Sequence, residues 1–321
     1  MNGTIDFKPL ETTPSKAYSK SHYFCDYIEL LALCDSDDGV SQSDVYDRFL
    51  EDGKINDIGS ENASESNESW NNRIYLWFSE IESRAHFYGD GYPFEIYNGR
   101  LKKKDTLVDI HFVYFSLLLS SLISYIRNYH VLTSTFELIS SLALSNYLPR
   151  VSRVHIFGVS SLDNDRYTGS LENKMTLLAS DLNLTKSTKA NVFKQGDNGD
   201  GGVDLVAWVP FEGDPTLAYF QIYLCQCAAG KDWTKKQASV ERVENYLIDI
   251  PDNTQNVLFV PYDFRDAERY FSEPGEITAS LVFDRHRILT LVEPNEVFSG
   301  KVGKELKNYI ETAVEFEEDI V

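Results

Sequence analysis

The sequence predicts an α/β protein in which a mostly helical N-terminal domain, residues 1–150, precedes an α/β domain, residues 151–321. Two observations lead to this expectation. Apolar residues recur at helical spacing through most of the first segment, whereas the second alternates amphipathic helices with short β-rich runs. That alternation is typical of an α/β layer, and a length of 321 residues favours two domains over one.

A pair of short helices is expected near the N-terminus. Residues 22–36, HYFCDYIELLALCDS, carry apolar residues at helical spacing, and SQSDVYDRFLEDG follows, with Ser41 or Ser43 as N-cap and Gly53 as its end. Two short helices with a tight turn resemble half of a helix-turn-helix. The pair is acidic, however, and has no run of Lys or Arg to bind phosphates, so a protein-binding or structural role is favoured over DNA reading.

The next segment, residues 54–70, is rich in Ser, Asn and Glu and lacks apolar periodicity, which predicts a flexible loop. A helix is then expected from Asn71 to near Gly89, because RIYLWFSEIESRAHFYG is amphipathic. PFEIYNGRLKKKD predicts a short hairpin with a basic tip at Lys102–Lys104.

One apolar stretch, residues 107–126, is about long enough to cross a membrane. It carries Asp109, His111 and several serines, which are costly in hydrocarbon, so a buried helix is favoured and no membrane contact is expected. A further helix is expected from about Ser134 to Tyr147.

The second domain is expected to open with a strand in VSRVHIFGVSS and a helix in SLENKMTLLASDLNL. That helix carries on one face Leu171, Met175, Leu178 and Leu182. Strands are then expected in VDLVAWVPF, AYFQIYLCQCAA and, after a helix in TKKQASVERVENYLID, in NVLFVPYDF. LVFDRHRILTLVE is expected to form the last strand and KELKNYIETAVEF the last helix.

The charge of the chain is its most unusual property. Thirty Lys and Arg residues stand against fifty Asp and Glu residues, a formal net charge of −20. Such acidity repels nucleic acid at long range, so any DNA contact needs a local basic patch or a partner. The four cysteines show no zinc-site spacing, and the first residues do not resemble a secretory signal, which together predict free thiols and a cytoplasmic location.

Candidate chemistry centres on GDGGVDLVAW, residues 199–208. Gly201 and Gly202 allow a sharp bend at the start of an apolar strand, and Asp204 follows directly. A carboxylate that enters a sheet costs free energy unless it is paired or binds a metal ion. Asp200 is expected to be a turn residue, and Asp204 to be functional.

The following strand, FQIYLCQCAAG, contributes Gln226 to an otherwise apolar run. Its amide is either satisfied in the core or acts as a neutral metal ligand beside Asp204. Lys231, Lys235 and Lys236 then make the next helix opening the most basic surface near this strand.

The order of an acidic helix, a GDGGVD strand and a Gln-bearing strand resembles the PD-(D/E)xK nuclease superfamily, particularly its Mrr-like QxK variant. The resemblance covers roughly residues 150–300 and implies a restriction-endonuclease-like core, a mixed central sheet flanked by helices. It implies that Asp204 takes the Asp position of the family, Gln226 the Glu or Gln position, and Glu172 the acid on the first core helix. Alternatively, Glu172 only stabilises the N-terminus of its own helix through the helix dipole.

The chain departs from the family pattern at the lysine. Ala228 stands where QxK requires Lys, so the resemblance implies either that Lys231, or failing it Lys235, reaches back from the loop, or that the copy is inactive.

The resemblance implies a Mg²⁺-dependent or Mn²⁺-dependent endodeoxyribonuclease in which Asp204, Gln226 and Glu172 hold the metal ion and Lys231 positions the attacking water. An acidic nuclease with a separate helical domain further resembles effectors of bacterial anti-phage defence, controlled by a protein partner such as an ATPase or helicase. The sequence leaves the oligomeric state open, with a homo-oligomer as one possibility. The alternatives are a catalytically inactive nuclease-like binding module and a transcriptional regulator acting through the first helix pair.

Overall fold

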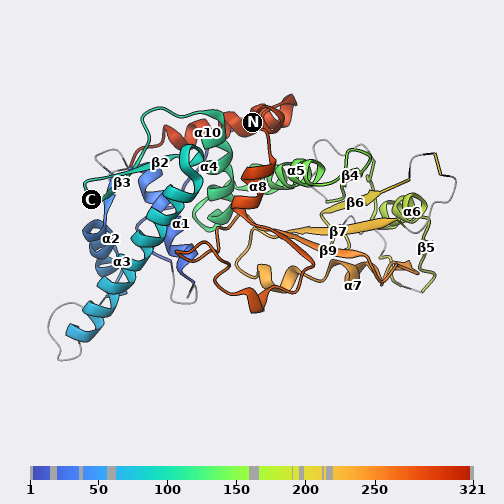
Figure 1. Ribbon diagram of the computed structural model, residues 1–321, viewed down its shortest axis with the longest axis horizontal. Coiled ribbons are helices and arrows are strands. Elements are labelled where there is room, and N and C mark those ends of the chain that lie inside the picture. The colour runs from blue at the N-terminus through green and yellow to red at the C-terminus, as the bar shows by residue number, and fades with distance from the viewer. Residues whose placement is uncertain are drawn as a thin grey trace. The chain divides into compact units, whose positions relative to one another are not determined.

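The computed structural model of the chain describes residues 3–14, 20–35, 39–55, 63–158, 166–189, 191–194, 199–211, 213–214 and 220–318. The protein is α/β and forms two compact units (Figure 1). The first, called the helical unit, comprises residues 1–132, 262–272 and 304–321, and the second, called the sheet unit, comprises residues 133–261 and 273–303. The units are therefore interleaved in sequence, whereas the sequence predicted one boundary at residue 150.

The helical unit contains helices α1 (Ser21–Cys34), α2 (Gln42–Glu51), α3 (Ala63–Tyr88), α4 (Asp109–Ser121) and most of α10 (Gly300–Val314). A small sheet accompanies them in the order β1 (Val40–Ser41), β3 (Arg100–Lys103), β2 (Phe94–Tyr97). Short 3-10 helices η1 (Gly89–Gly91) and η2 (Ile123–Tyr125) follow α3 and α4. Among the described residues no helix is long and apolar enough to cross a membrane.

Two local predictions in this unit are confirmed. The N-cap of α2 is Ser41, whose hydroxyl accepts a hydrogen bond from the Asp44 N–H while the Asp44 carboxylate accepts one from the Ser41 N–H. The hairpin is formed by β2 and β3, but it turns at Asn98 and Gly99, both with positive φ, as a two-residue Asn-Gly turn requires. The predicted basic tip is wrong, because Lys102 and Lys103 lie on β3, paired with Glu95 and Phe94 away from the turn.

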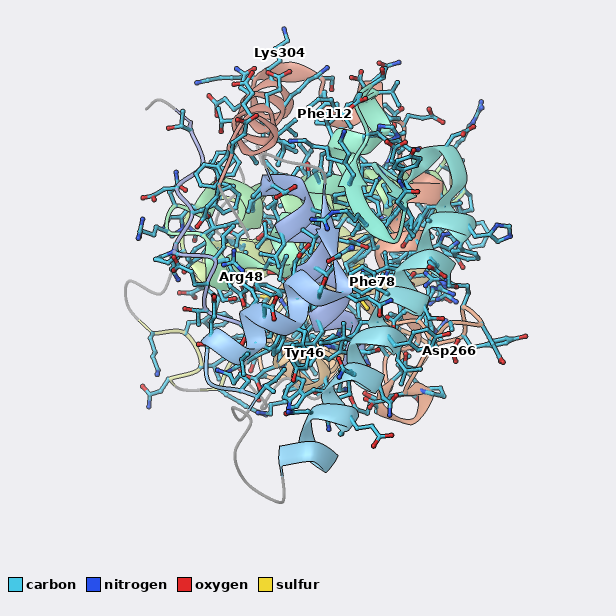
Figure 2. All side chains as sticks on the ribbon, turned by 90° about the vertical axis from the view of Figure 1, so that its left-hand side faces the viewer. Tyr46, Arg48, Phe78, Phe112, Asp266 and Lys304 are labelled. Atoms are coloured by element: carbon cyan, nitrogen blue, oxygen red, sulfur yellow. The ribbon has the colours of Figure 1, made fainter. Side chains whose placement is uncertain are left out.

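The start of α3 was predicted wrongly. The helix begins at Ala63, within the segment expected to be a loop through residue 70. Trp70 is buried, as are Trp77 and Phe78 further along the helix, so the apolar face extends further back than the polar composition suggests. Figure 2 labels Phe78 on this helix. Residues 56–62 of the expected loop lie outside the described residues.

A buried group of charges lies in the core of the helical unit. Arg84 on α3 is fully buried, and its Nη1 lies 2.8 Å from Asp26 and 2.9 Å from Glu29, both on α1 and both fully buried. Its Nη2 donates to the backbone oxygen of Asp263 at 3.1 Å, and its Nε lies 3.7 Å from the carboxylate of the same residue. Buried charges persist when each is paired in this way.

The sheet unit is built on a five-stranded mixed sheet within the described residues, in the order β10 (Leu281–Phe283), β9 (Gln255–Phe259), β7 (Gln221–Cys227), β6 (Leu205–Val209), β4 (Arg153–Ile156). Strands β4, β6 and β7 are antiparallel neighbours, and β7, β9 and β10 run parallel. Its helices are α5 (His130–Tyr147), α6 (Leu171–Leu182), α7 (Ser239–Val243), α8 (Arg285–Leu291) and α9 (Pro294–Val297), with 3-10 helices η3 (Trp233–Lys236) and η4 (Pro274–Glu276). A two-stranded sheet joins β5 (Thr185–Lys186) to β8 (Leu247–Ile248).

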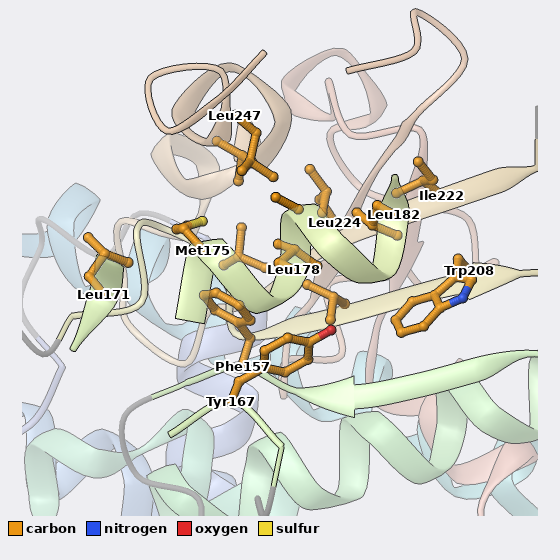
Figure 3. Packing of buried hydrophobic residues seen from close by; sticks show 14 of the residues in the cluster. Phe157, Tyr167, Leu171, Met175, Leu178, Leu182, Trp208, Ile222, Leu224 and Leu247 are labelled. Atoms are coloured by element: carbon orange, nitrogen blue, oxygen red, sulfur yellow. The ribbon is translucent and has the colours of Figure 1, made fainter. Parts of the chain in front are cut away.

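Helix α6 packs its predicted apolar face onto the sheet (Figure 3). Ser170 caps its N-terminus and Asn183, in the left-handed region, ends it. The cluster it forms with the sheet contains Leu171, Met175, Leu178, Leu182, Val206, Trp208, Ile222 and Leu224. Because strand side chains alternate, this is also the face to which Gln226 belongs.

The last predicted strand was too long. Strand β10 ends at Phe283, and α8 begins two residues later because the Asp284 carboxylate caps it, accepting a hydrogen bond from the Arg287 N–H at 3.1 Å. Arg285, in the first turn of α8, is fully buried and donates to the Pro261 backbone oxygen at 2.9 Å.

Candidate functional site

Asp204 lies directly before β6, where three strands meet. Its N–H donates to the Cys225 oxygen on β7 at 2.8 Å, and its own oxygen accepts from the N–H groups of Phe157 and Gly158, just after β4, at 2.7 and 3.0 Å. These bonds continue the ladders on both sides, so the backbone of Asp204 is fixed by two neighbouring strands.

The two glycines before Asp204 serve both a turn and its packing. Gly201 and Gly202 have φ values of 65° and 87°, and the Asp200 carboxylate accepts from the Gly202 N–H at 2.7 Å. Asp200 is thus a turn residue, as predicted. A Cβ on Gly201 would lie 2.5 Å from Met175 Cε, and one on Gly202 would overlap the side chain of Arg242. Both positions therefore need glycine for conformation and for space.

The Asp204 carboxylate is buried and held by neighbours on β7. Its Oδ2 accepts from the Gln226 amide nitrogen and from the Cys227 N–H, the latter at 2.6 Å. Burial raises the pKa of Asp204 to about 6, and the bonds from Cys227 and Gln226 oppose that rise. The structure thus brings together the two residues, Asp204 and Gln226, that the sequence placed in one site.

The amide of Gln226 has partners on both sides. Its nitrogen donates to Asp204, and its Oε1 accepts from Arg242 Nη1 at 2.8 Å. Gln226 therefore orients the carboxylate, and it would offer its oxygen to a metal ion only if the amide were turned over. Arg242, on α7, was missed by sequence reasoning. The available signal was Gly202, since a glycine at a strand can mark the close approach of another group, but it does not identify that group.

Glu172 does not reach this site. The residue is exposed, and its carboxylate accepts a hydrogen bond from Lys186 Nζ at 2.8 Å rather than contacting Asp204 or Gln226. The reason is helical geometry: Leu171 and Met175 face the sheet, so Glu172 is rotated toward solvent.

The predicted lysines occupy the surface beside η3. Lys231 is exposed, and Lys235 bonds Asp232 at 3.0 Å; the Asp232 pKa is lowered mainly by Lys235 and further by Lys231 and Lys236. Lys236 is the member of this group whose charge acts to lower the Asp204 pKa. Ala228 is fully buried, and its N–H donates to the Phe259 backbone oxygen. The position at which the family has its lysine therefore holds a methyl group in the core.

A second acid approaches the same strand end from α5. The Glu137 carboxylate lies against Gly158, with Oε2 2.5 Å from where a Cβ on that glycine would stand. The Gly158 N–H bonds the Asp204 backbone oxygen. Glu137 was missed because the segment around it reads as an apolar helix, and nothing local marks one acid on it as functional.

Lys174, on α6, is a buried ammonium near these acids. Its Nζ has two long contacts, 3.4 Å each, with the backbone oxygens of Phe157 and Gly199, and among the described residues it forms no ion pair. Burial lowers the Lys174 pKa, opposed by the charges of Asp200 and Glu137.

Comparison of the chain with protein-family models, with curated proteins and with solved structures gave no match. Within the part of the chain that the structure describes, no three Asp, Glu, His or Cys side chains form a ready metal-binding group. The arrangement instead joins a buried carboxylate, an amide and a guanidinium in one bonded series, with a further acid and lysine beside it.

Proposed function

We propose that the sheet unit is a divalent-metal-dependent endonuclease that hydrolyses phosphodiester bonds in DNA. The observation that carries the proposal is the contact between Asp204 and Gln226 at the ends of two adjacent strands. Burial opposes ionisation of this carboxylate, and ionisable groups whose pKa is shifted in this way are concentrated at functional sites.

The order of elements supports the nuclease resemblance. Helix α5, strands β4, β6 and β7, helix α7 and strand β9 follow each other in sequence, with α6 inserted after β4. The first three strands are antiparallel neighbours and β9 joins β7 in parallel. A restriction-endonuclease-like core is part of this proposal, and in it the first core helix is α5. We therefore assign the helix acid to Glu137 in place of Glu172.

The donor types fit Mg²⁺ or Mn²⁺, which are commonly bound through one or two carboxylates, with waters and substrate phosphates completing the shell. In this proposal Asp204 and Glu137 supply those carboxylates. Glu137 lies against Gly158, whose N–H bonds the Asp204 backbone oxygen. When bound, such an ion lowers the pKa of a coordinated water and neutralises charge on phosphate.

The chain's own groups prepare the site for this chemistry. The Gln226 amide and the Cys227 N–H fix the orientation of the Asp204 carboxylate, and the charge of Lys236 favours its ionised form. Lys174 places a positive charge near Glu137. Arg242 fixes the far end of Gln226, so the carboxylate is held before substrate arrives.

A partner is part of the proposal. The net charge of −20 disfavours unassisted encounter with DNA, which suits an effector recruited by another protein, as in anti-phage defence. The helical unit is proposed as the docking surface.

The test is cleavage of supercoiled plasmid by the full-length protein in Mg²⁺ or Mn²⁺, alone and with candidate partner proteins. Asp204→Asn should lose cleavage, and Asp252→Asn, which changes an exposed acid of the same unit, should retain it. Cleavage at the wild-type rate by Asp204→Asn would rule out the proposed centre.

One observation favours the alternative of an inactive binding module, namely the buried Ala228 at the expected lysine position. Metal titration separates the two. A nuclease should show Mn²⁺ affinity that Asp204→Asn abolishes, whereas an inactive copy should show none.

A further inference from the structure

Arg242 carries a charge that its contacts hold in place without neutralising. Nη1 donates to Gln226 Oε1 at 2.8 Å, and Nη2 donates to the Lys235 backbone oxygen at 3.0 Å. Both acceptors are neutral, and among the described residues Arg242 forms no ion pair with a carboxylate. A guanidinium has five N–H donors, so donors remain for a further acceptor.

The position of Arg242 is fixed before any ligand binds. Its side chain passes against Gly202, whose α-carbon has no room for a Cβ. The residue is half-buried, so its stem is packed while its head group is reachable from solvent. A guanidinium held in this way loses little conformational entropy when it binds a further group.

We propose that Arg242 binds a phosphate group of a nucleic acid strand beside the Asp204 carboxylate, an inference that rests on the nuclease function proposed above. The planar fork of arginine matches two phosphate oxygens, which makes it better suited to this contact than a neutral donor. Lys236 adds a second positive charge close enough to act on Asp204. Together they supply the local basic surface that so acidic a chain needs to contact DNA.

The competing explanation is that Arg242 acts only by orienting Gln226. The salt dependence of DNA binding separates the two, because each phosphate contact contributes about 0.9 to the slope of log K against log salt. If Arg242 only orients Gln226, its replacement can change the affinity for DNA but leaves the slope unchanged, because no phosphate contact is lost.

The experiment measures binding of fluorescent duplex DNA to the full-length protein by anisotropy across a range of NaCl concentrations. Ca²⁺ replaces Mg²⁺, since it takes the same oxygen ligands, and gels confirm that the DNA stays intact. The proteins compared are the wild type, Arg242→Met, Arg242→Lys and, as a reference for loss of one exposed charge, Lys189→Met.

Arg242→Met should weaken binding about tenfold or more and reduce the slope by about 0.9. Arg242→Lys should restore the slope but only part of the affinity, and Lys189→Met should change both less than Arg242→Met does. A slope unchanged by Arg242→Met would overturn the inference. The proposed function would still stand in that case if the wild type cleaves DNA in Mg²⁺. Binding with the expected slope change but without cleavage under any condition would support the inference and reject hydrolysis. Failure of the wild type to bind DNA, both alone and with the candidate partner proteins, would overturn both.

Discussion

Gly202 lies against the side chain of Arg242 so closely that even a methyl group at residue 202 would overlap the arginine stem. This relationship links the turn before Asp204 to the guanidinium that bonds Gln226. The glycine is therefore required both by its backbone conformation and by its neighbour, and the two requirements can be separated by mutation.

Gly202→Ala should destabilise the protein more than Gly213→Ala does. Both residues have positive φ, 87° and 78°, so alanine is strained at either position, at a cost of about 1 kcal/mol. Residue 213 has open space around a Cβ, whereas residue 202 would also displace Arg242. Urea unfolding followed by circular dichroism measures both. Equal losses would mean that Arg242 moves aside freely.

Glu137→Gln should reduce cleavage by about a hundredfold or more, as expected for loss of a charged group that stabilises the reacting centre. Glu172→Gln should stay within about twofold of wild type, because Glu172 is exposed and bonds Lys186. Plasmid cleavage rates at saturating Mg²⁺ test this pair. The reverse outcome would return the helix acid to α6.

Asp204 should make stability depend on pH. Burial raises its pKa to about 6 from an ordinary value of 3.8, so the folded state binds a proton more tightly than the unfolded state. That stabilisation is complete below about pH 4 and is lost as pH rises through about 6, a change on the order of 3 kcal/mol at most.

The comparison with Asp204→Asn isolates this effect. The variant, which does not ionise, should be more stable than wild type at pH 7, and the difference should shrink toward pH 4. At pH 7, Mg²⁺ should reduce this difference in stability, because it binds the ionised carboxylate of the folded wild type. Denaturant unfolding at several pH values measures the difference, and a difference that does not vary with pH would show that Asp204 is not the titrating group.

The contact between Asp204 and Gln226 could be predicted from the sequence because its signals are local. Gly201 and Gly202 mark the bend, and a lone amide in an apolar strand must find a partner. Alternation along the strands then places both side chains on one face. The α6 face and the presence of a hairpin were predictable for the same reason, since each depends on residues close together in sequence. The position of the hairpin turn was predicted wrongly, because the run of lysines was given more weight than the Asn-Gly pair that turns the chain.

The other residues of the proposed site depend on tertiary geometry. Glu137 and Arg242 come from elements far from Asp204 in sequence, and only the packing of α5 and α7 brings them near it. Glu172 was preferred because it opens a helix next to the motif, but its position on the helix turns it to solvent. The interleaving of the two units also could not be predicted from local sequence. Residues 262–272 belong to the helical unit, where Asp263 joins the charge cluster around Arg84, far from it in sequence.

That cluster gives the last prediction. Arg84→Met should destabilise the helical unit by about 3–5 kcal/mol, because it leaves the buried carboxylates of Asp26 and Glu29 without their cation. Arg73→Met, on the exposed face of the same helix, should cost less than about 1 kcal/mol. Urea unfolding of the two variants provides the measurement, with a triple variant Arg84→Met, Asp26→Asn, Glu29→Gln as a further control. Since removal of the carboxylate charges relieves the uncompensated burial, the triple variant should recover part of the lost stability. No recovery would mean that the cost of Arg84→Met comes from lost packing around the guanidinium rather than from charge.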